Sequence, residues 1–238
     1  MFDFSIIAQE WPTYLQGLGN TVWLVALSLF LGLLIAIPLG ICRNSSNPLV
    51  RLPAWGYIYF FRGTPLLVQL FIIYYGAGQW GWLKESWAWN WFQEAWFCAL
   101  LSFMLNTSAY TAEIIRGAIR TIPRGEIEAA QAFGMTPWQT MKGIVLPSAL
   151  RRALPAYSNE VIFMLHGSAV AGIITVVDLT GAARNVYSRH FAPFEAFVFV
   201  GLIYLALTFV LVGLFKLAER RWLAHLAPRK AAARGQSS

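Results

Sequence analysis

Five long apolar stretches, separated by more polar segments, dominate the pattern of this chain. A helix needs about 20 mostly apolar residues to cross the hydrocarbon core of a bilayer. The pattern therefore predicts five membrane-spanning helices, over residues 21–41, 54–75, 95–117, 156–177 and 196–215. The segment 118–155 is too long for a simple connector. We expect a single all-α membrane domain over 1–238.

Composition supports the membrane assignment. Hydrophobic residues make up 58% of the chain, charged residues only 12%, and the mean hydropathy is +0.54. A soluble domain usually carries about 25% charged residues. The net charge of +7 could suggest nucleic-acid binding, but the positions of the basic residues give it another meaning.

Most Lys and Arg residues lie in three segments, 42–53, 118–155 and 216–238, which the five spans place on one side of the membrane. The other side holds only Lys84, Arg184 and Arg189. Positive residues stay cytoplasmic. We therefore expect an inner-membrane protein with a periplasmic N-terminus and a cytoplasmic C-terminus, and no nucleic-acid partner. Cys42 and Cys98 then lie at opposite faces and cannot pair.

Two further patterns concern membrane packing. Gly32, Ala36 and Gly40 are four residues apart, a spacing that permits close helix contact within the chain or with a second membrane subunit. The external segment between the second and third spans is rich in Trp, which favours the headgroup layer. We interpret these tryptophans as an interfacial anchor, with substrate stacking as the alternative.

The long basic segment predicts a helical hairpin. Residues 126–133 are rich in helix formers and begin with acidic residues, which suits a helix start. Gly134 is placed for a left-handed helix end. Pro137 then opens a second short helix, and Pro147 is expected to stop it.

This hairpin carries a recognisable pattern. Glu128-Ala129-Ala130 is followed after three residues by Gly134 and after nine more by Ile144-Val-Leu146-Pro147. The pattern resembles the EAA loop of bacterial ABC importer permeases, in which this loop docks into a groove on the ATPase subunit. The resemblance implies that the residues that couple to the ATPase are Glu128, Ala129, Ala130, Phe133, Gly134, Ile144, Leu146 and Pro147.

Other segments narrow the resemblance. They are Arg62–Gln69, Tyr110–Gly117, Leu146–Arg151, Ala153–Val161, Met164–Ala169 and Ala218–Leu223. Together they are similar to the polar amino acid uptake family, nearest to the M-type membrane subunits of histidine/lysine/arginine/ornithine importers and their opine-transporting relatives. The resemblance implies a type I importer permease fold and a polar, basic amino acid or an opine as substrate. An importer for glutamine or glutamate is the alternative.

The same resemblance implies the partners. They are an ABC ATPase homodimer, a second homologous permease subunit, and a periplasmic amino-acid-binding protein. The chain has no G-x-x-x-x-G-K-[ST] phosphate loop, so we expect ATP and magnesium to bind only the ATPase, and no cofactor or metal to bind this chain. H-E-x-x-H and G-x-S-x-G motifs are also missing, which disfavours an intramembrane enzyme. A membrane scaffold is the remaining rival.

Ionisable residues inside spans are costly and mark pathways. Asn106, Tyr110 and Glu113 share one helical face of the third span. We expect this face to line the substrate path, with Arg116 binding a carboxylate and Glu113 binding an ammonium or guanidinium group. The alternative is that Glu113 and Arg116, three residues apart, pair with each other.

The fourth span and its end add three more candidates. Glu160 is interpreted as a gate or a subunit-interface contact, with interface or structural roles favoured, and is kept as a candidate substrate contact. His166 is a hydrogen-bonded packing residue or a proton carrier, with the first interpretation favoured. Asp178, expected at the periplasmic mouth, attracts a cationic ligand, contacts a binding protein or is merely solvated. The sequence leaves the exact amino acid or opine open.

Overall fold

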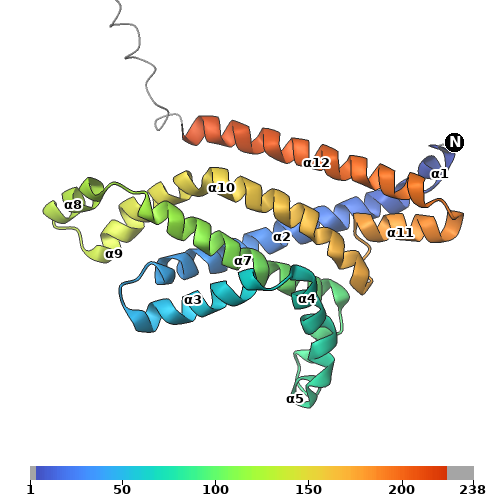
Figure 1. The fold of residues 1–238 in the computed structure, drawn as a ribbon, viewed down its shortest axis with the longest axis horizontal. Helices are drawn as coiled ribbons and strands as arrows, with labels where there is room; N and C mark the ends of the chain where they lie inside the picture. The colour runs from blue at the N-terminus through green and yellow to red at the C-terminus, as the bar shows by residue number, and fades with distance from the viewer. Residues whose placement is uncertain (1–3, 224–238) are drawn as a thin grey trace, which may run out of the picture.

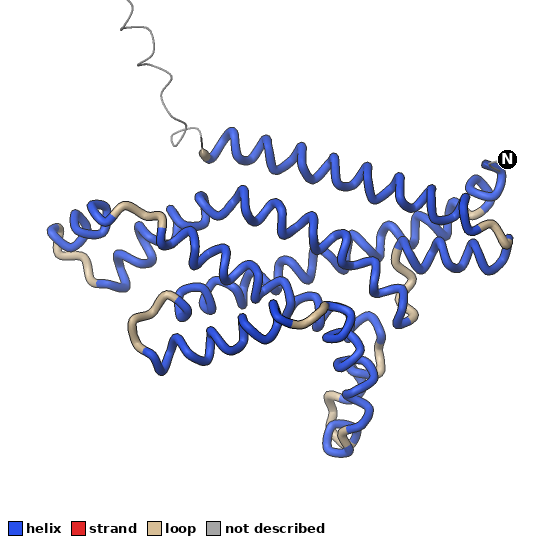
Figure 2. The backbone as a smooth tube through the Cα atoms, viewed as in Figure 1, coloured by secondary structure: helices blue, strands red, loops and turns tan. Residues whose placement is uncertain are grey.

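The computed structural model describes residues 4–223, which form helices and turns without a strand (Figures 1 and 2). Long helices run along the length of the molecule, and a short arm leaves them sideways (Figure 1). The α-helices are α1 (Phe4–Gln9), α2 (Trp11–Arg43), α3 (Pro48–Gly63), α4 (Leu66–Phe71), α5 (Gly81–Lys84), α6 (Trp89–Phe92), α7 (Ala95–Arg120), α8 (Arg124–Ala132), α9 (Pro137–Thr140), α10 (Leu146–Gly167), α11 (Leu179–His190) and α12 (Pro193–Trp222).

Three helices, α2, α7 and α12, are each long and apolar enough to cross a membrane. They contain the predicted first, third and fifth spans. Their environments differ: 67% of the most apolar part of α7 is buried inside the chain, against 6% for α12. The third span is therefore the central helix, and α12 leaves most of its apolar surface to lipid or to another subunit.

The predicted second span is wrong as a single helix. It is broken between α3 and the helical segment Leu66–Gln79, which meet at a bend of 103°. Pro65 explains the break, because proline has no N–H and disfavours helical geometry at the residue before it; Thr64 is extended there. Gln69 Nε2 donates to the carbonyls of Phe61 and Thr64 at 2.8 and 3.0 Å. This bonding satisfies backbone groups that the break frees inside an apolar layer.

The predicted fourth span also differs from the structure. Its helix, α10, begins at Leu146, so the expectation that Pro147 stops a helix is wrong. Pro147 lies in the first turn of α10, where a missing N–H costs no hydrogen bond. The path continues through a 3₁₀ turn at Ser168–Ile174 and left-handed Thr175 before α11, with a 46° bend. This span is also a broken one.

The small residues of α2 pack on α7 within the same chain. A Cβ atom added at Gly32 would lie 2.5 Å from Thr107 Cγ2, and one at Gly40 would lie 3.0 Å from the Ala112 carbonyl oxygen. Ala36 between them is fully buried. The predicted close contact is confirmed, and in this structure it serves the fold of this subunit.

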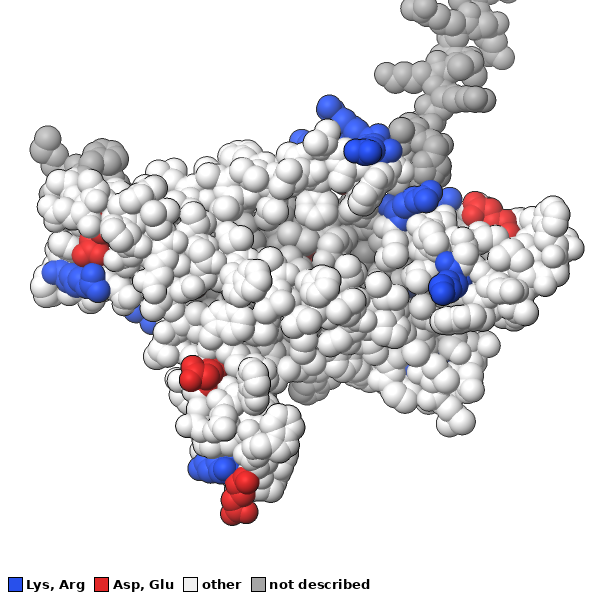
Figure 3. Space-filling model, turned by 180° about the vertical axis from the view of Figure 1, so that it is seen from behind, with Lys and Arg blue, Asp and Glu red and all other residues white. Residues whose placement is uncertain are grey.

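The two ends of the molecule differ in charge. Helices α8 and α9 lie at one end, and α1 and α11 at the other (Figure 1). On the face in Figure 3, most Lys and Arg side chains lie toward the end that carries α8 and α9. This separation of charge follows the pattern from which the topology was predicted. Arg229, Lys230 and Arg234, which contributed to that prediction, lie outside the described residues.

The end opposite the hairpin is tied together by Glu10. Its carboxylate pairs with Arg189 at 3.1 Å and accepts from His190 Nε2 at 3.0 Å, which joins the start of α2 to the end of α11. The hydrogen bonds from His190, Thr13 and Arg189 hold the pKa of Glu10 below its usual value. The carboxylate therefore stays ionised near neutral pH.

Candidate functional site

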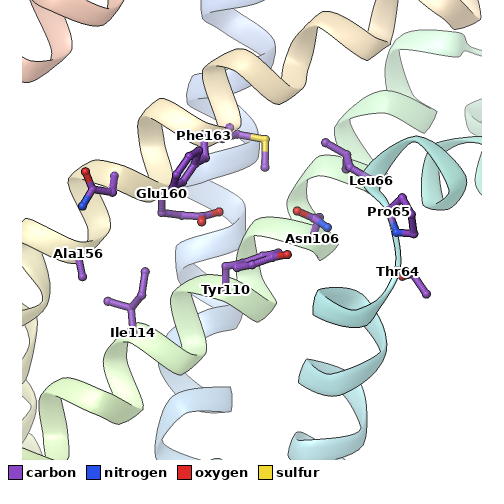
Figure 4. Close-up of a pocket in the computed structure, with 11 residues that line it drawn as sticks. Thr64, Pro65, Leu66, Asn106, Tyr110, Ile114, Ala156, Glu160 and Phe163 are labelled. Carbon is purple, nitrogen blue, oxygen red and sulfur yellow. The ribbon is translucent and has the colours of Figure 1, made fainter.

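A cavity of about 560 Å³ lies where the second span breaks, between α4, α7 and α10 (Figure 4). We call it the Glu160 cavity. Its wall includes Thr64, Pro65, Asn106, Tyr110, Glu160 and Phe163. In Figure 4, Asn106 and Tyr110 project from α7, and Glu160 projects from α10 on the other side. The break in the helix thus opens a space that is bordered by polar side chains of α7 and α10.

One wall of this cavity is a fixed amide network. Asn106 Nδ2 donates to Gln69 Oε1 at 3.0 Å, and Gln69 in turn donates to Thr64 Oγ1 at 2.8 Å. Gln69 is only 3% exposed. Because buried amides are held by their partners, the break and the cavity have a defined shape. The sequence analysis missed Gln69; the signal was a glutamine four residues after Pro65 in an apolar span.

The opposite wall carries a buried acid. Glu160 is 7% exposed, and its Oε1 accepts from Thr107 Oγ1 at 2.9 Å. Within residues 4–223 it forms no ion pair. A buried carboxylate without a counter-charge is costly. A cation that enters the cavity would remove that cost.

The predicted face of α7 divides between two cavities. Asn106 and Tyr110 line the Glu160 cavity, whereas Glu113 lines a second cavity of about 340 Å³. Glu113 accepts from Arg116 Nε at 2.7 Å. The alternative in which Glu113 and Arg116 pair is therefore observed, and Arg116 is not among the residues that line either cavity.

Asp178 has a structural position. It is fully buried, and its Oδ1 accepts from the Gly181 N–H at 2.7 Å, which caps the start of α11. A Cβ atom at Gly172 would lie 2.7 Å from the same oxygen. The interpretation of Asp178 as a solvated residue is wrong. It lies in neither of the two cavities.

His166 joins two helices. Its Nε2 lies 3.0 Å from Thr208 Oγ1, which connects the end of α10 to α12. The favoured interpretation is met in its hydrogen bond, but His166 is exposed in this chain, so its packing role stays a prediction.

The hairpin of α8 and α9 presents an aromatic surface. Gly134 has φ +76°, the predicted left-handed helix end. Phe133 before it is 90% exposed and Trp138 is 68% exposed. Glu128 and Ala129 are also exposed, whereas Ala130 is buried at 4% and is not part of the outward surface of the hairpin. Ile144, Leu146 and Pro147 are partly buried at the base.

The sequence of residues 15–224 matches the family described as "Binding-protein-dependent transport system inner membrane component". The chain belongs to this family. The permease is 45% identical to the histidine/lysine/arginine/ornithine transport system permease protein HisM of Salmonella typhimurium, covering 94% of this chain and 99% of HisM. It is 43% identical to the nopaline transport system permease protein NocM of Agrobacterium fabrum, with 95% of each chain covered.

Solved structures agree with the family. The permease is similar to a chain from the crystal structure of an amino acid ABC transporter with histidines, at 34% identity and a TM-score of 0.82, covering 93% of this chain and 99% of that one. The MetNI methionine ABC transporter shares the fold at 20% identity and a TM-score of 0.73, covering 88% and 95%. This permease therefore has the type I ABC importer fold and is a transporter subunit rather than an enzyme.

Proposed function

We propose that this permease imports basic amino acids or opines, and that the Glu160 cavity binds the cationic group of the substrate. The observation that carries the proposal is the buried, unpaired carboxylate of Glu160 facing the amide wall of Asn106. A carboxylate binds an ammonium or guanidinium ion through short, charge-assisted hydrogen bonds. The relatives named above are permeases of transport systems for histidine, lysine, arginine and ornithine, or for nopaline.

The alternative substrates fit less well. Glutamate would place a second carboxylate beside Glu160, and like charges in a buried site repel. Glutamine would bring only its α-ammonium group as a cation, whereas a basic amino acid also supplies a cationic side chain that can pair with Glu160. The electrostatics of the cavity therefore favour a cationic side chain.

The proposal includes the partners expected from the sequence. An ATPase homodimer binds Phe133 and Trp138 on the exposed hairpin, since exposed aromatic side chains are common at protein interfaces. A second permease subunit covers exposed apolar surface of this chain, and a periplasmic binding protein delivers substrate. ATP and magnesium bind the ATPase. With the hairpin cytoplasmic, the N-terminus of this inner-membrane protein is periplasmic and the C-terminus cytoplasmic.

The broken second span suits alternating access. Transporters build substrate sites from discontinuous helices near the middle of the membrane. Here the break at Thr64 borders the cavity, and α10 is connected to α9 by the π-helical turn Met141–Val145. A push on the hairpin would move α10 and with it Glu160. Binding and coupling are thus connected by one continuous segment.

The test is uptake of labelled L-arginine by the assembled importer carrying Glu160→Gln. Loss of a charged hydrogen-bond partner is expected to raise the KM for L-arginine about tenfold or more. Glu85→Gln, an exposed acid outside both cavities, is the matched control and should change nothing. An unchanged KM in Glu160→Gln, with normal amounts of protein in the membrane, would refute the proposed site.

A further inference from the structure

The second cavity, which we call the Arg43 cavity, contains more positive than negative charge. Its wall includes Arg43, Arg62 and Glu113, together with the aromatic residues Trp55 and Tyr59. Arg116 pairs with Glu113 from outside the wall. Three guanidinium groups thus surround one carboxylate, and both Arg43 and Arg62 are close enough to Glu113 to interact with it electrostatically.

These charges are incompletely matched. Arg43 Nε and Glu113 Oε2 are both buried without a hydrogen-bond partner among the described residues. Arg43 and Arg62 form no ion pair there either. Arg43 is the last residue of α2 and is partly buried, and Arg62 lies in the last turn of α3, within the broken second span. Charged residues are rare in spans and mark functional sites. The wall carries more positive than negative charge, so it would attract an anionic group.

The Arg43 cavity and the Glu160 cavity share a boundary. Gly63 lines the first and Thr64, the next residue, lines the second. Tyr110 lines the Glu160 cavity, and the Arg62 guanidinium lies over its ring at 5.2 Å from the centroid. Glu113 is one turn further along α7, toward the end that carries the hairpin. A molecule leaving the Glu160 cavity toward the hairpin end would pass the Tyr110–Arg62 contact and meet Arg43.

We infer that the Arg43 cavity is a second substrate subsite on the cytoplasmic side, which binds the carboxylate of the amino acid or opine after it leaves Glu160. Arginine binds carboxylates in two-pronged, charge-assisted geometry. The subsite rests on the proposed function, because it assumes an amino acid in the first cavity. The two cavities then recognise opposite ends of one molecule: the cation first and the carboxylate second.

The experiment uses proteoliposomes that contain the assembled importer, with ATP inside and labelled L-arginine and binding protein outside. Unlabelled L-arginine or agmatine is added inside; agmatine has the guanidinium group and lacks the carboxylate. In the wild type, internal L-arginine should inhibit uptake at a concentration about tenfold or more below that needed for agmatine, because only L-arginine has the anion that the arginines bind.

The variant Arg43→Gln should raise the half-inhibitory concentration of internal L-arginine about tenfold, and leave that of agmatine unchanged. Arg43→Lys should retain much of the inhibition. Arg220→Gln, at an exposed arginine of α12 that lines neither cavity, is the matched control. If Arg43→Gln does not assemble, the comparison of L-arginine with agmatine in the wild type decides.

Three results would overturn the inference. The first is equal inhibition by internal L-arginine and agmatine in the wild type. The second is an unchanged half-inhibitory concentration of internal L-arginine in Arg43→Gln. The third is a difference in that concentration between the wild type and Arg43→Gln that disappears when phosphatidylglycerol is left out of the vesicles. The last result would identify the cavity as a lipid-phosphate site. Failure of Glu160→Gln to change the external KM would refute the first cavity instead, so the two proposals fail separately.

Discussion

The Glu160 cavity and the Arg43 cavity lie on either side of the same helix break and have opposite charge. The first contains a buried acid that forms no ion pair within residues 4–223, and the second contains more arginines than acids. Between them stands the contact of Arg62 with Tyr110. An amino acid carries both signs of charge, so neither cavity suffices for the whole molecule. The difference indicates that recognition is divided along α7, and not concentrated at one point.

The largest predicted effect comes from removing the difference in charge between the Glu160 cavity and the Arg43 cavity. Glu160→Arg would place a positive charge in both cavities. We expect uptake of L-arginine to fall about a hundredfold or more, because a hydrogen-bonded ion pair is replaced by repulsion between like charges. Initial uptake rates in cells with matched amounts of membrane-inserted protein measure this. Uptake within a few fold of the wild type would show that the cation does not bind at Glu160.

A smaller effect is expected from the opposite wall of the Glu160 cavity. Asn106→Leu removes the donor to Gln69 Oε1 and leaves that buried oxygen with one partner fewer. The change should lower uptake about tenfold, and equally for L-arginine and L-histidine, because the wall sets shape and not charge. Competition between the two amino acids is the measurement. A selective loss of one substrate would assign Asn106 a direct role in choosing the side chain.

The fold could be predicted from the sequence where local chemistry determined it. Gly134 was identified as a left-handed helix end because few other residues adopt that backbone geometry. The break at Thr64 had a local cause in Pro65. The prediction of one span ignored it, because hydropathy reports the length of an apolar stretch and not the direction of its helix axis. The 103° bend depends on how Gln69 satisfies the freed carbonyls, which sequence spacing does not contain.

The site was less predictable because it joins residues that are distant in the chain. Asn106 and Glu160 were both candidates, yet only the packing of α10 beside α7 brings them to one cavity. Asp178 was expected at an external mouth, but burial and the cap on Gly181 give it a structural role. Arg43 counted only as one of the basic residues of the segment 42–53, and Arg62 only as part of the motif Arg62–Gln69. Their convergence on Glu113 is a tertiary contact.

The smallest predicted effect is also the sharpest test of the charge difference between the two cavities. It is expected to strengthen the inhibition by internal L-arginine, whereas Arg43→Gln is expected to weaken it. Among the described residues that line the Arg43 cavity, Glu113 is the only acid, so Glu113→Gln makes that cavity more positive. Internal L-arginine should then inhibit uptake at a concentration about threefold lower than in the wild type, the opposite of the change expected for Arg43→Gln. The effect is modest because charges in a partly open site are screened.

The control for Glu113→Gln comes from its own partner. The double variant Glu113→Gln/Arg116→Gln removes one charge of each sign and restores the original excess, so its half-inhibitory concentration should return toward that of the wild type. This return also excludes simple damage from leaving Arg116 unpaired. If the single and double variants have the same half-inhibitory concentration, net charge does not govern binding in the Arg43 cavity. The proposal that this cavity recognises the carboxylate would then be refuted.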